Sequence, residues 1–228
     1  SGGTFCVING DLITSLRVEE MLEFHRSNGG IGTISLWEVE DPSRFGVADY
    51  REESGKIMRF QEKPSIEEAF SNLINAGAYI LEPEIFNLMP DGAHSMERDV
   101  YENLAATGGL NGFPFEGWFV DAGTPQSFVE ASQACISACS FSSGSVDRDS
   151  WFGEGSTNKG EVFSSTIGFG ACIEEGSVVR DSVVLEGAEI GPNCNIEGCL
   201  IGMRARIPEG SDLRSKIVDH SQPKKKIR

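Results

Sequence analysis

The first patterned stretch of the chain is TFCVINGD, residues 4–11, in which an apolar run leads directly into Asn-Gly-Asp. Apolar and β-branched residues favour a strand, whereas Asn, Gly and Asp favour a tight turn. Ligands of open α/β sheets bind beyond the carboxyl ends of the strands. The carboxylate of Asp11 is therefore a candidate ligand group, and a turn residue that caps the following segment is the alternative.

Strand-like and helix-like patterns alternate from this turn to about residue 139. Alternation of this kind predicts an α/β domain with a mostly parallel sheet, in which the first strand lies in the middle. The expected elements are a helix from a cap at Thr14 or Ser15 to residues 28–30, strands over 31–37, 45–50, 57–61, 75–81 and 118–121, a helix over 96–104, and a helix with Thr124 as N-cap and Pro125 at its first position.

A different pattern begins after a Ser-rich stretch at residues 140–145. Aliphatic residues recur every six positions, and the phase slips by one residue between series, so some turns of a coil would be one residue short. Six-residue repeats with one aliphatic each predict a β-helix that buries those side chains in a column. The repeat positions are Ile167, Ile173, Val178, Val179, Val184, Ile190, Ile196, Ile201, Ile207 and Leu213.

These patterns divide the chain into a domain at 1–140, a linker at 141–165, a β-helix at 166–221 and a basic tail at 222–228. The formal charge of −16 argues against a nucleic-acid partner, because phosphate backbones require clustered Lys and Arg. No apolar run approaches the ~20 residues that span a bilayer, so no membrane partner is expected. The six cysteines include no C-x-x-C pair, which favours reduced thiols and a cytoplasmic location over zinc binding.

Two further carboxylate-bearing segments are candidates for chemistry. Asp121 follows the strand expected over 118–120, and strand-end carboxylates of one sheet can converge on a metal such as Mg²⁺. Glu62 and Lys63 end another strand, where Pro64 stops the ladder and leaves the lysine free to reach a phosphate. Successive strand residues point to opposite faces, so this Glu and Lys need not form an ion pair. A turn residue and a solvated strand end are the alternatives.

Small residues mark two places where a ligand could approach the backbone. Gly77 follows Asn75 at the start of a strand, and Asn75 could hydrogen-bond a hydroxyl group. Gly46 lies in a Phe-Gly-Val segment and offers similar backbone contact. Plain turn-to-strand junctions explain either motif alone.

In combination the motifs are specific. The order Asn-Gly-Asp, Phe-Gly-Val, Glu-Lys-Pro, Asn-Ala-Gly, Trp-Phe-Val-Asp-Ala-Gly-Thr and then hexapeptide repeats resembles the sugar-1-phosphate nucleotidyltransferases, from residue 5 to about 218, with a lean to the mannose-1-phosphate guanylyltransferase branch. The resemblance implies a mostly parallel, Rossmann-like sheet followed by a short left-handed hexapeptide β-helix. It implies that Asp11 and Asp121 hold a catalytic Mg²⁺ and that Lys63 contacts the sugar phosphate. It also implies a sugar pocket lined by Gly46, Glu62, Asn75 and Gly77.

The family's first motif, a Gly-rich loop that grips the nucleotide triphosphate, does not occur in these 228 residues. Such a loop supplies backbone N–H groups to the phosphates. We therefore expect the chain to be an N-terminally truncated part of an enzyme that joins an NTP to a sugar 1-phosphate, and we expect the chain alone to be inactive. The open ends of such a fragment also predict a homo-oligomer.

Two alternatives remain open. The chain could be a non-catalytic regulatory or assembly subunit related to these enzymes. It could also be a hexapeptide-repeat acyltransferase, a class that generally uses a histidine of the coil as base. His220 is the only histidine beyond residue 94, and it follows the last regular repeat, which weighs against the acyltransferase.

Overall fold

The structure, a computed structural model, describes residues 2–138, 141 and 143–219. It divides into two compact units, Ser1–Phe119 and Val120–Arg228, which are described separately below. The basic tail at 222–228 and His220 lie outside the described residues. No helix within the described ranges is long and apolar enough to cross a membrane.

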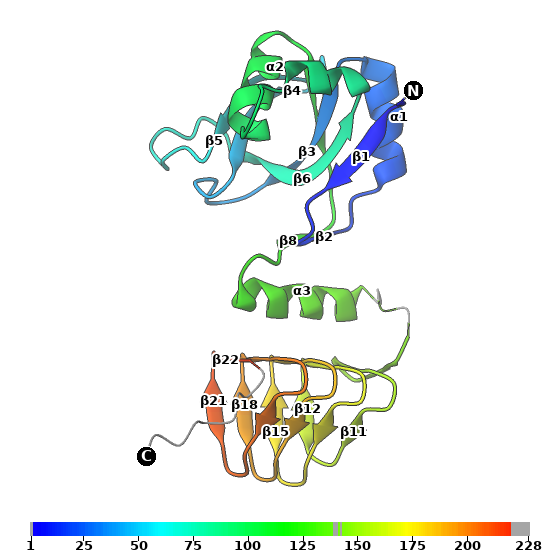
Figure 1. Ribbon diagram of the computed structural model, residues 1–228, viewed down its shortest axis with the longest axis vertical. Coiled ribbons are helices and arrows are strands. Elements are labelled where there is room, and N and C mark those ends of the chain that lie inside the picture. Colours follow the sequence, from blue (N-terminus) through cyan, green and yellow to red (C-terminus); the bar gives the residue numbers. More distant parts are fainter. Residues whose placement is uncertain (1, 139–140, 142, 220–228) are drawn as a thin grey trace. The chain divides into compact units, whose positions relative to one another are not determined.

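The first unit is built on a six-stranded sheet with the order β1-β6-β3-β7-β5-β4 (Figure 1). A short strand, β2, pairs with β8, which begins at the last residue of this unit. The strands are β1 (Phe5–Ile8), β2 (Leu12–Thr14), β3 (Gly32–Glu38), β4 (Gly46–Arg51), β5 (Lys56–Glu62), β6 (Leu73–Leu81), β7 (Leu110–Pro114) and β8 (Phe119–Asp121).

The expected α/β class is confirmed, but the expectation of a mostly parallel sheet is wrong for the described strands. β3 pairs with β7 in parallel, whereas the other pairings in the sheet are antiparallel. Parallel neighbours need a long crossover, usually a helix, and a tight connection gives antiparallel ones. The turn between β4 and β5 is such a tight connection. The first strand, β1, lies at the edge of the described sheet and not in its middle.

Helical segments cover both faces of this sheet. α1 (Val18–Asn28) ends, as expected, at Gly29 with φ 59°. Its N-cap is Arg17, and not Thr14 or Ser15; the hydroxyl of Ser15 instead accepts a hydrogen bond from Trp118 N at 2.8 Å. The opposite face packs against η1 (Pro83–Leu88), η2 (Met96–Tyr101) and α2 (Glu102–Ala106), and the main core there is Ile34, Leu36, Ala48, Ile57, Phe60, Tyr79, Leu81, Ile85, Val100, Tyr101, Leu104, Ala105 and Leu110.

A β-bulge distorts the pairing of β3 with β6. Ile34 pairs with Tyr79 and Leu36 with Asn75, so three residues of β6 face the single residue Ser35. The hydroxyl of Ser35 accepts a hydrogen bond from Ala78 N at 3.1 Å, which satisfies one backbone group that the bulge displaces. Bulges bend a strand and redirect its side chains. This bulge sets the direction of residues 75–78.

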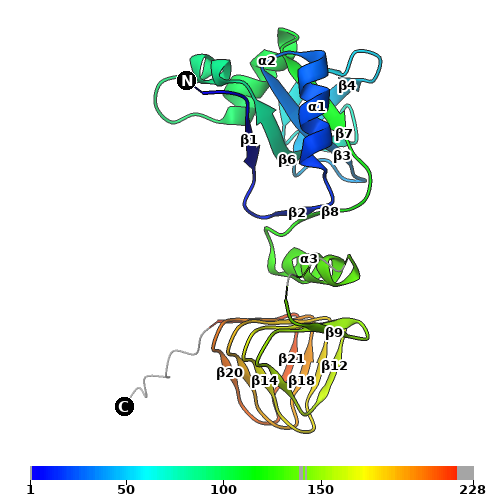
Figure 2. The same cartoon turned by 90° about the vertical axis from the view of Figure 1, so that its right-hand side faces the viewer.

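The second unit consists of helix α3 and a stack of coils (Figure 2). α3 (Pro125–Ser137) begins as expected, with the Thr124 hydroxyl accepting from Ser127 N at 3.1 Å and Pro125 at the first position. Three parallel stacks of short strands form the coils, together with the hairpin strand β9 (Ser145–Asp147). The stacks are β10 (Ser150–Phe152), β13 (Thr166–Ile167), β16 (Val183–Val184), β19 (Leu200–Ile201) and β22 (Ile217–Val218); β11 (Thr157–Asn158), β14 (Cys172–Ile173), β17 (Glu189–Ile190) and β20 (Arg206–Ile207); and β12 (Glu161–Phe163), β15 (Val178–Arg180), β18 (Asn195–Glu197) and β21 (Asp212–Arg214).

The predicted hexapeptide β-helix is confirmed, including the shortened turns. Glu189 pairs with Arg206 in the next coil, 17 residues later, which is one less than three full hexapeptides. The first step is shorter, with 15 residues from Ser150 to Ser165. The first coil thus starts within the segment 141–165 that we expected to be a linker.

Small residues let the coils stack closely. Ser150, Ser165 and Ser182 form a buried ladder in which each hydroxyl accepts a hydrogen bond from a backbone N–H of the next coil. Cys199 continues this ladder, and its sulfur accepts from Lys216 N at 3.4 Å. Most of the predicted aliphatic column is buried, with Ile167, Ile173, Val179, Val184, Ile190, Ile196 and Ile201 at 0% exposure. Val178 and Leu213, which were predicted to share the column, are only half-buried.

Candidate active site

The turn after β1 lies against β6. Asn9 N donates to Gly77 O at 2.8 Å, and Leu12 N donates to Asn9 O at 3.2 Å and closes the turn that carries Asp11. Gly77 has φ +74°, and a Cβ there would lie 2.8 Å from Asn9 Nδ2. Both the left-handed backbone and this close approach require glycine. The site-residue predictions for Asp11 and Gly77 thus fall on two segments that touch.

The Asn75 side chain is held at both ends. Its Nδ2 donates to the hydroxyl of Tyr79 at 2.9 Å, and its Oδ1 accepts from Gly77 N at 3.0 Å. Tyr79 is buried, and desolvation raises the pKa of its phenol to about 12. The Asn75 amide therefore has a fixed orientation, which is the property that a group recognising a hydroxyl needs.

Glu62 and Gly46 face each other across the β4–β5 hairpin. A Cβ on Gly46 would lie 3.0 Å from Glu62 Oε2 and would collide with the Phe60 ring. Glycine at this position therefore makes room for the carboxylate of Glu62, whose side chain is 13% exposed. Glu62 N in turn donates to Glu102 Oε1 at 3.1 Å, which ties the end of β5 to α2.

Lys63 departs from strand geometry. Its φ is +47°, in the left-handed region that is costly for a residue with a Cβ. This turn breaks the alternation of side chains, so Lys63 Nζ lies 3.6 Å from Glu62 Oε1 and the two form an ion pair that their sequence positions did not require. Lys63 N donates to Phe45 O at 3.0 Å and fixes the strained residue. Strain of this kind clusters at functional sites.

The electrostatics around Glu62 are mixed. Burial raises the pKa of the Glu62 carboxyl, the negative charge of Glu97 raises it further, and Lys63 and Arg98 lower it. The charges of Glu97 and Glu62 also raise the pKa of Tyr79, so these two carboxylates lie within electrostatic range of the phenol. Amide, phenol, carboxylate and ammonium groups gathered in this way can bind hydroxyl groups and a phosphate.

The two predicted metal ligands belong to different units. Asp11 is exposed in the first unit. Asp121 is the second residue of the second unit, and its Oδ1 accepts from Gly123 N at 3.0 Å, which is the turn role expected as its alternative. Their approach to a shared Mg²⁺ stays a prediction. Within the described residues no group of three or more His, Cys, Asp or Glu side chains could hold a metal.

Sequence reasoning missed four residues of this site, namely Asn9, Tyr79, Glu97 and Glu102. Asn9 belongs to the quoted Asn-Gly-Asp segment, and Tyr79 stands four residues after Asn75, so both were adjacent to recognised motifs. Glu97 and Glu102 come from η2 and α2, more than 30 positions along the chain from Glu62, and only tertiary packing brings them near it.

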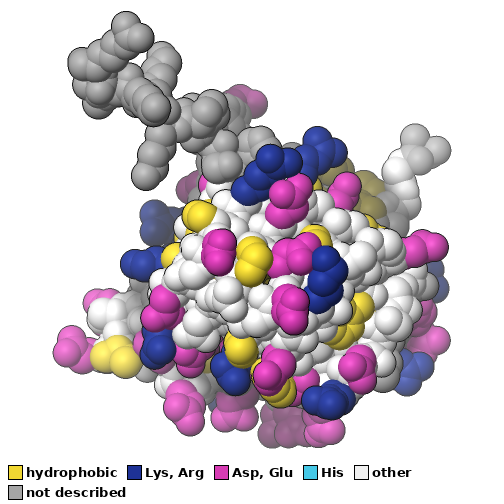
Figure 3. Space-filling view, turned by 90° about the horizontal axis from the view of Figure 1, so that it is seen from below, with side chains coloured by type: hydrophobic (Ala, Val, Ile, Leu, Met, Phe, Trp, Pro, Cys, Tyr) yellow, Lys and Arg dark blue, Asp and Glu magenta, His cyan; other side chains and the backbone are white. Residues whose placement is uncertain are grey.

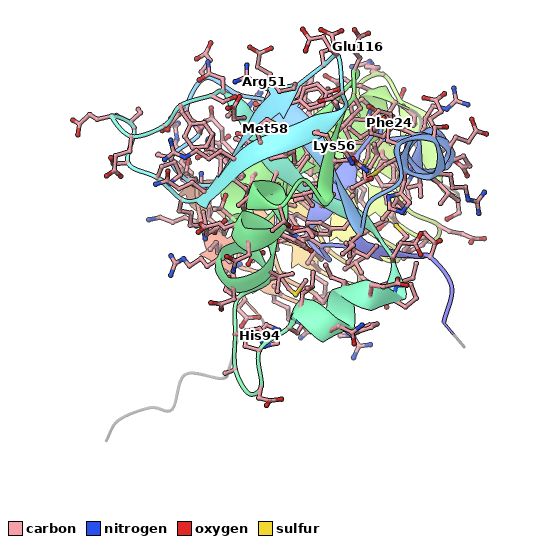
Figure 4. All side chains as sticks on the ribbon, turned by 90° about the horizontal axis from the view of Figure 1, so that it is seen from above. Phe24, Arg51, Lys56, Met58, His94 and Glu116 are labelled. Atoms are coloured by element: carbon pink, nitrogen blue, oxygen red, sulfur yellow. The ribbon has the colours of Figure 1, made fainter. Side chains whose placement is uncertain are left out.

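The described histidines, His25 and His94, both belong to the first unit. His25 is buried in α1, where its Nδ1 lies 2.7 Å from the Thr33 hydroxyl. His94 is exposed on a loop of the first unit (Figure 4). The acyltransferase alternative therefore has no described histidine on a coil to act as base.

Comparisons with known proteins agree with this architecture. The sequence model of the nucleotidyl transferase family matches residues 1–137, and that of the GlmU-like C-terminal hexapeptide matches residues 131–221. The chain therefore belongs to the nucleotidyl transferase family.

Its relatives include mannose-1-phosphate guanylyltransferase 1 of Arabidopsis thaliana, which is 29% identical over 96% of this chain and 63% of the relative. The catalytic subunit beta of mannose-1-phosphate guanylyltransferase from Dictyostelium discoideum is 39% identical over 56% of this chain and 35% of the relative. The corresponding subunit of Xenopus tropicalis is 38% identical over 55% of this chain and 34% of the relative. The chain thus spans less than two thirds of the length of these relatives.

Proposed function

We propose that the protein to which this chain belongs transfers a nucleotidyl group from an NTP to a sugar 1-phosphate and releases pyrophosphate. A phosphate oxygen of the sugar phosphate attacks the α-phosphorus of the NTP. The observation that carries the proposal is that the first unit holds both a fixed amide at Asn75 and a half-buried carboxylate at Glu62 that pairs with the ammonium of Lys63. The relatives favour GTP and mannose 1-phosphate as the substrate pair.

The chain's own residues have distinct roles in this proposal. The Lys63 ammonium, which is 60% exposed, binds the sugar phosphate as a point charge. Asn75 and Glu62 bind sugar hydroxyl groups, and Gly46 and Gly77 let the sugar approach the backbone. Phosphoryl chemistry depends mostly on positioning and charge stabilisation, so these fixed groups supply the orientation.

Asp11 and Asp121 are proposed to hold Mg²⁺. Carboxylate oxygens suit this hard cation, which usually takes one or two protein carboxylates and completes its shell with water and substrate phosphates. The exposure of Asp11 fits such a role, as does the second carboxylate oxygen of Asp121, which accepts no hydrogen bond from the described residues. When bound, the metal supplies positive charge that neutralises the phosphate oxygens.

The experiment is a calorimetric titration of the 228-residue chain with α-mannose 1-phosphate and Mg²⁺, with inorganic phosphate and glucose 1-phosphate as competing probes. Lys63→Ala is expected to weaken binding of both sugar phosphates and of phosphate about tenfold or more, because it removes the point charge. Asn75→Ala is expected to weaken the binding of the sugar phosphates and to leave the binding of inorganic phosphate unchanged. If the wild-type chain binds sugar phosphates no better than inorganic phosphate, the proposed sugar site is wrong.

A transfer assay on the full-length protein, with each NTP against several sugar 1-phosphates, identifies the substrate pair. Formation of a nucleotide sugar that Asp11→Asn abolishes supports the enzyme. A full-length protein that binds sugar phosphate but forms no product supports the non-catalytic subunit instead.

We further propose that the protein is a cytoplasmic homo-oligomer that assembles through its second unit. Met203 and Ile217 are 60% and 62% exposed on the coils, and such apolar positions favour contact with another copy. Among the described residues, the face drawn in Figure 3 intersperses Lys and Arg with Asp and Glu. Light scattering of the chain and of a Met203→Glu, Ile217→Glu variant tests this: a wild-type monomer would contradict the assembly.

A further inference from the structure

An aromatic stack in the core of the first unit holds the phenol of Tyr79 near the turn after β1 and the start of β6. The ring of Tyr79 is 3% exposed and stacks on Tyr101, with centroids 5.3 Å apart and planes 23° apart. The Phe60 ring packs against the other end of this stack, edge to face, at 6.2 Å from Tyr101. Stacked and edge-to-face contacts of this kind fix a ring in place. The position of the Tyr79 hydroxyl is therefore set by the core and not by solvent.

Two side-chain amides lie near this hydroxyl. Asn75 Nδ2 donates to it at 2.9 Å, and the side chain of Asn9 lies close enough to lower the pKa of the phenol. The two asparagines come from different segments, since Asn75 lies in β6 and Asn9 follows β1. A phenol oxygen can accept from both donors and still donate its own proton.

Both asparagines are also anchored on Gly77. Asn75 Oδ1 accepts from Gly77 N at 3.0 Å, and the backbone N–H of Asn9 donates to Gly77 O at 2.8 Å. The Asn9 side chain occupies the space in which a Cβ of Gly77 would lie. Asn9, Gly77, Asn75 and Tyr79 are thus connected: the Tyr79 hydroxyl and Gly77 N hold the two ends of the Asn75 amide, and Gly77 O holds the backbone of Asn9.

We infer that Tyr79 is a positioning residue whose hydroxyl fixes the Asn75 amide on Gly77, the residue that also holds Asn9, so that the turn carrying Asp11 and the sugar-facing segment of β6 behave as one rigid element. The effect of Tyr79 on ligand binding rests on the proposed function, in which Asp11 binds the metal and Asn75 binds the sugar. Gly10 alone separates Asn9 from Asp11, and the Leu12–Asn9 hydrogen bond closes that turn. A fixed Asn9 amide therefore limits the freedom of Asp11.

The test compares Tyr79→Phe with Tyr101→Phe. Both variants keep the aromatic stack and remove the hydroxyl of a buried tyrosine. Tyr101 makes no hydrogen bond to Asn75 or Asn9 among the described residues, so Tyr101→Phe is the matched control. The first readout is the pair of Asn75 side-chain amide signals in the NMR spectrum of the ligand-free chain, assigned by their loss in Asn75→Ala. Tyr79→Phe is expected to speed the solvent exchange of these protons about tenfold, and Tyr101→Phe to leave it within twofold.

The second readout is affinity. Tyr79→Phe is expected to weaken the binding of α-mannose 1-phosphate about tenfold, measured by calorimetry. It is also expected to weaken the binding of Mn²⁺, a paramagnetic probe for Mg²⁺, several-fold, measured by electron paramagnetic resonance. Both effects follow because the groups that bind these ligands lose their fixed orientation. Tyr101→Phe is expected to change neither by more than twofold.

The outcomes separate the two proposals. Unchanged Asn75 amide exchange in Tyr79→Phe overturns the positioning role, whatever the chain binds. A wild-type chain that binds no sugar phosphate overturns the proposed function, and the amide exchange still decides the role of Tyr79. If the Phe variant does not fold, 4-fluorophenylalanine at position 79 fills the hydroxyl's volume without its hydrogen bonds and gives the same two readouts.

Discussion

Replacing Gly191 by alanine tests how closely the coils of the second unit approach. A Cβ at this position would lie 2.8 Å from two backbone atoms of the next coil, Glu209 N and Ile207 O. Neither atom is the end of a flexible side chain, so the coils themselves must separate. Gly191 is also tied into the stack, because its N–H donates to Ile207 O at 2.9 Å and its carbonyl accepts from the Ser177 hydroxyl at 2.7 Å.

The magnitude follows from these distances. Ordinary van der Waals contact begins at 3.4 Å, so the coils must part by about 0.6 Å, which stretches the Gly191–Ile207 hydrogen bond to about 3.5 Å, beyond its favourable range. Weakened ladder bonds cost about 1 kcal/mol each and overpacking about 1–3 kcal/mol, so we expect a loss of about 3 kcal/mol in the free energy of unfolding. At roughly 4 °C per kcal/mol for a unit of this size, Tm should fall by about 12 °C.

Differential scanning calorimetry measures this change, and Gly210→Ala is the control. Gly210 has φ +70° but open space around its Cβ position, so alanine there adds only backbone strain of about 1 kcal/mol. Gly191→Ala should therefore be clearly the more damaging of the two. Equal transition temperatures for the Gly191 variant and the wild type would refute the close backbone approach.

Three other substitutions probe the first unit and the coil core. Glu62→Gln should be more stable than the wild type at pH 7.5. Burial and the charge of Glu97 raise the pKa of the Glu62 carboxyl, so the native state binds this proton more tightly than the unfolded state. The free energy of unfolding of the wild type therefore falls as the pH rises through the raised pKa. This advantage should disappear in urea titrations below about pH 3, where the carboxyl is protonated in both states, and an advantage that persists there would contradict the account. Lys63→Gly should exceed Lys63→Ala in stability by about 1 kcal/mol, since glycine relieves the φ of +47°; equal urea midpoints would show that no strain is stored. Ile190→Ala should cost about 3 kcal/mol and the exposed Val146→Ala about 0.5 kcal/mol, and similar losses would show that the buried column does not carry the stability of the coils.

The helix and strand positions were largely predictable, because each depends on local signals. The glycines after Asn28 end α1, and Thr124 with Pro125 begins α3, since these residues favour such positions through their own backbone geometry and short-range hydrogen bonds. The exception at Ser15 has a tertiary cause. Its hydroxyl bonds to Trp118, a residue 103 positions away that no local pattern could identify.

The candidate site was predictable as a set of residues but not as an arrangement. The motifs pointed to Glu62, Lys63, Asn75 and Gly77, but strand alternation separated Glu62 from Lys63. The left-handed backbone of Lys63 reverses that alternation, and it depends on contacts with Phe45 across the sheet. Tyr79 read as an ordinary strand residue, and only the stacking of its ring and the convergence of two amides distinguish its hydroxyl.

The sequence by itself determined the β-helix, its aliphatic column and the shortened turns, because every coil repeats the same local requirement and the period is visible along the chain. It also determined the family, through motifs whose order is specific. Tertiary structure alone decided that the sheet is mostly antiparallel, that a bulge at Ser35 redirects β6, and that η2 and α2 bring Glu97 and Glu102 towards Glu62. These features depend on which distant segments pack together. The free energy of that packing depends on both segments of each pair, so the sequence of one segment alone does not reveal it.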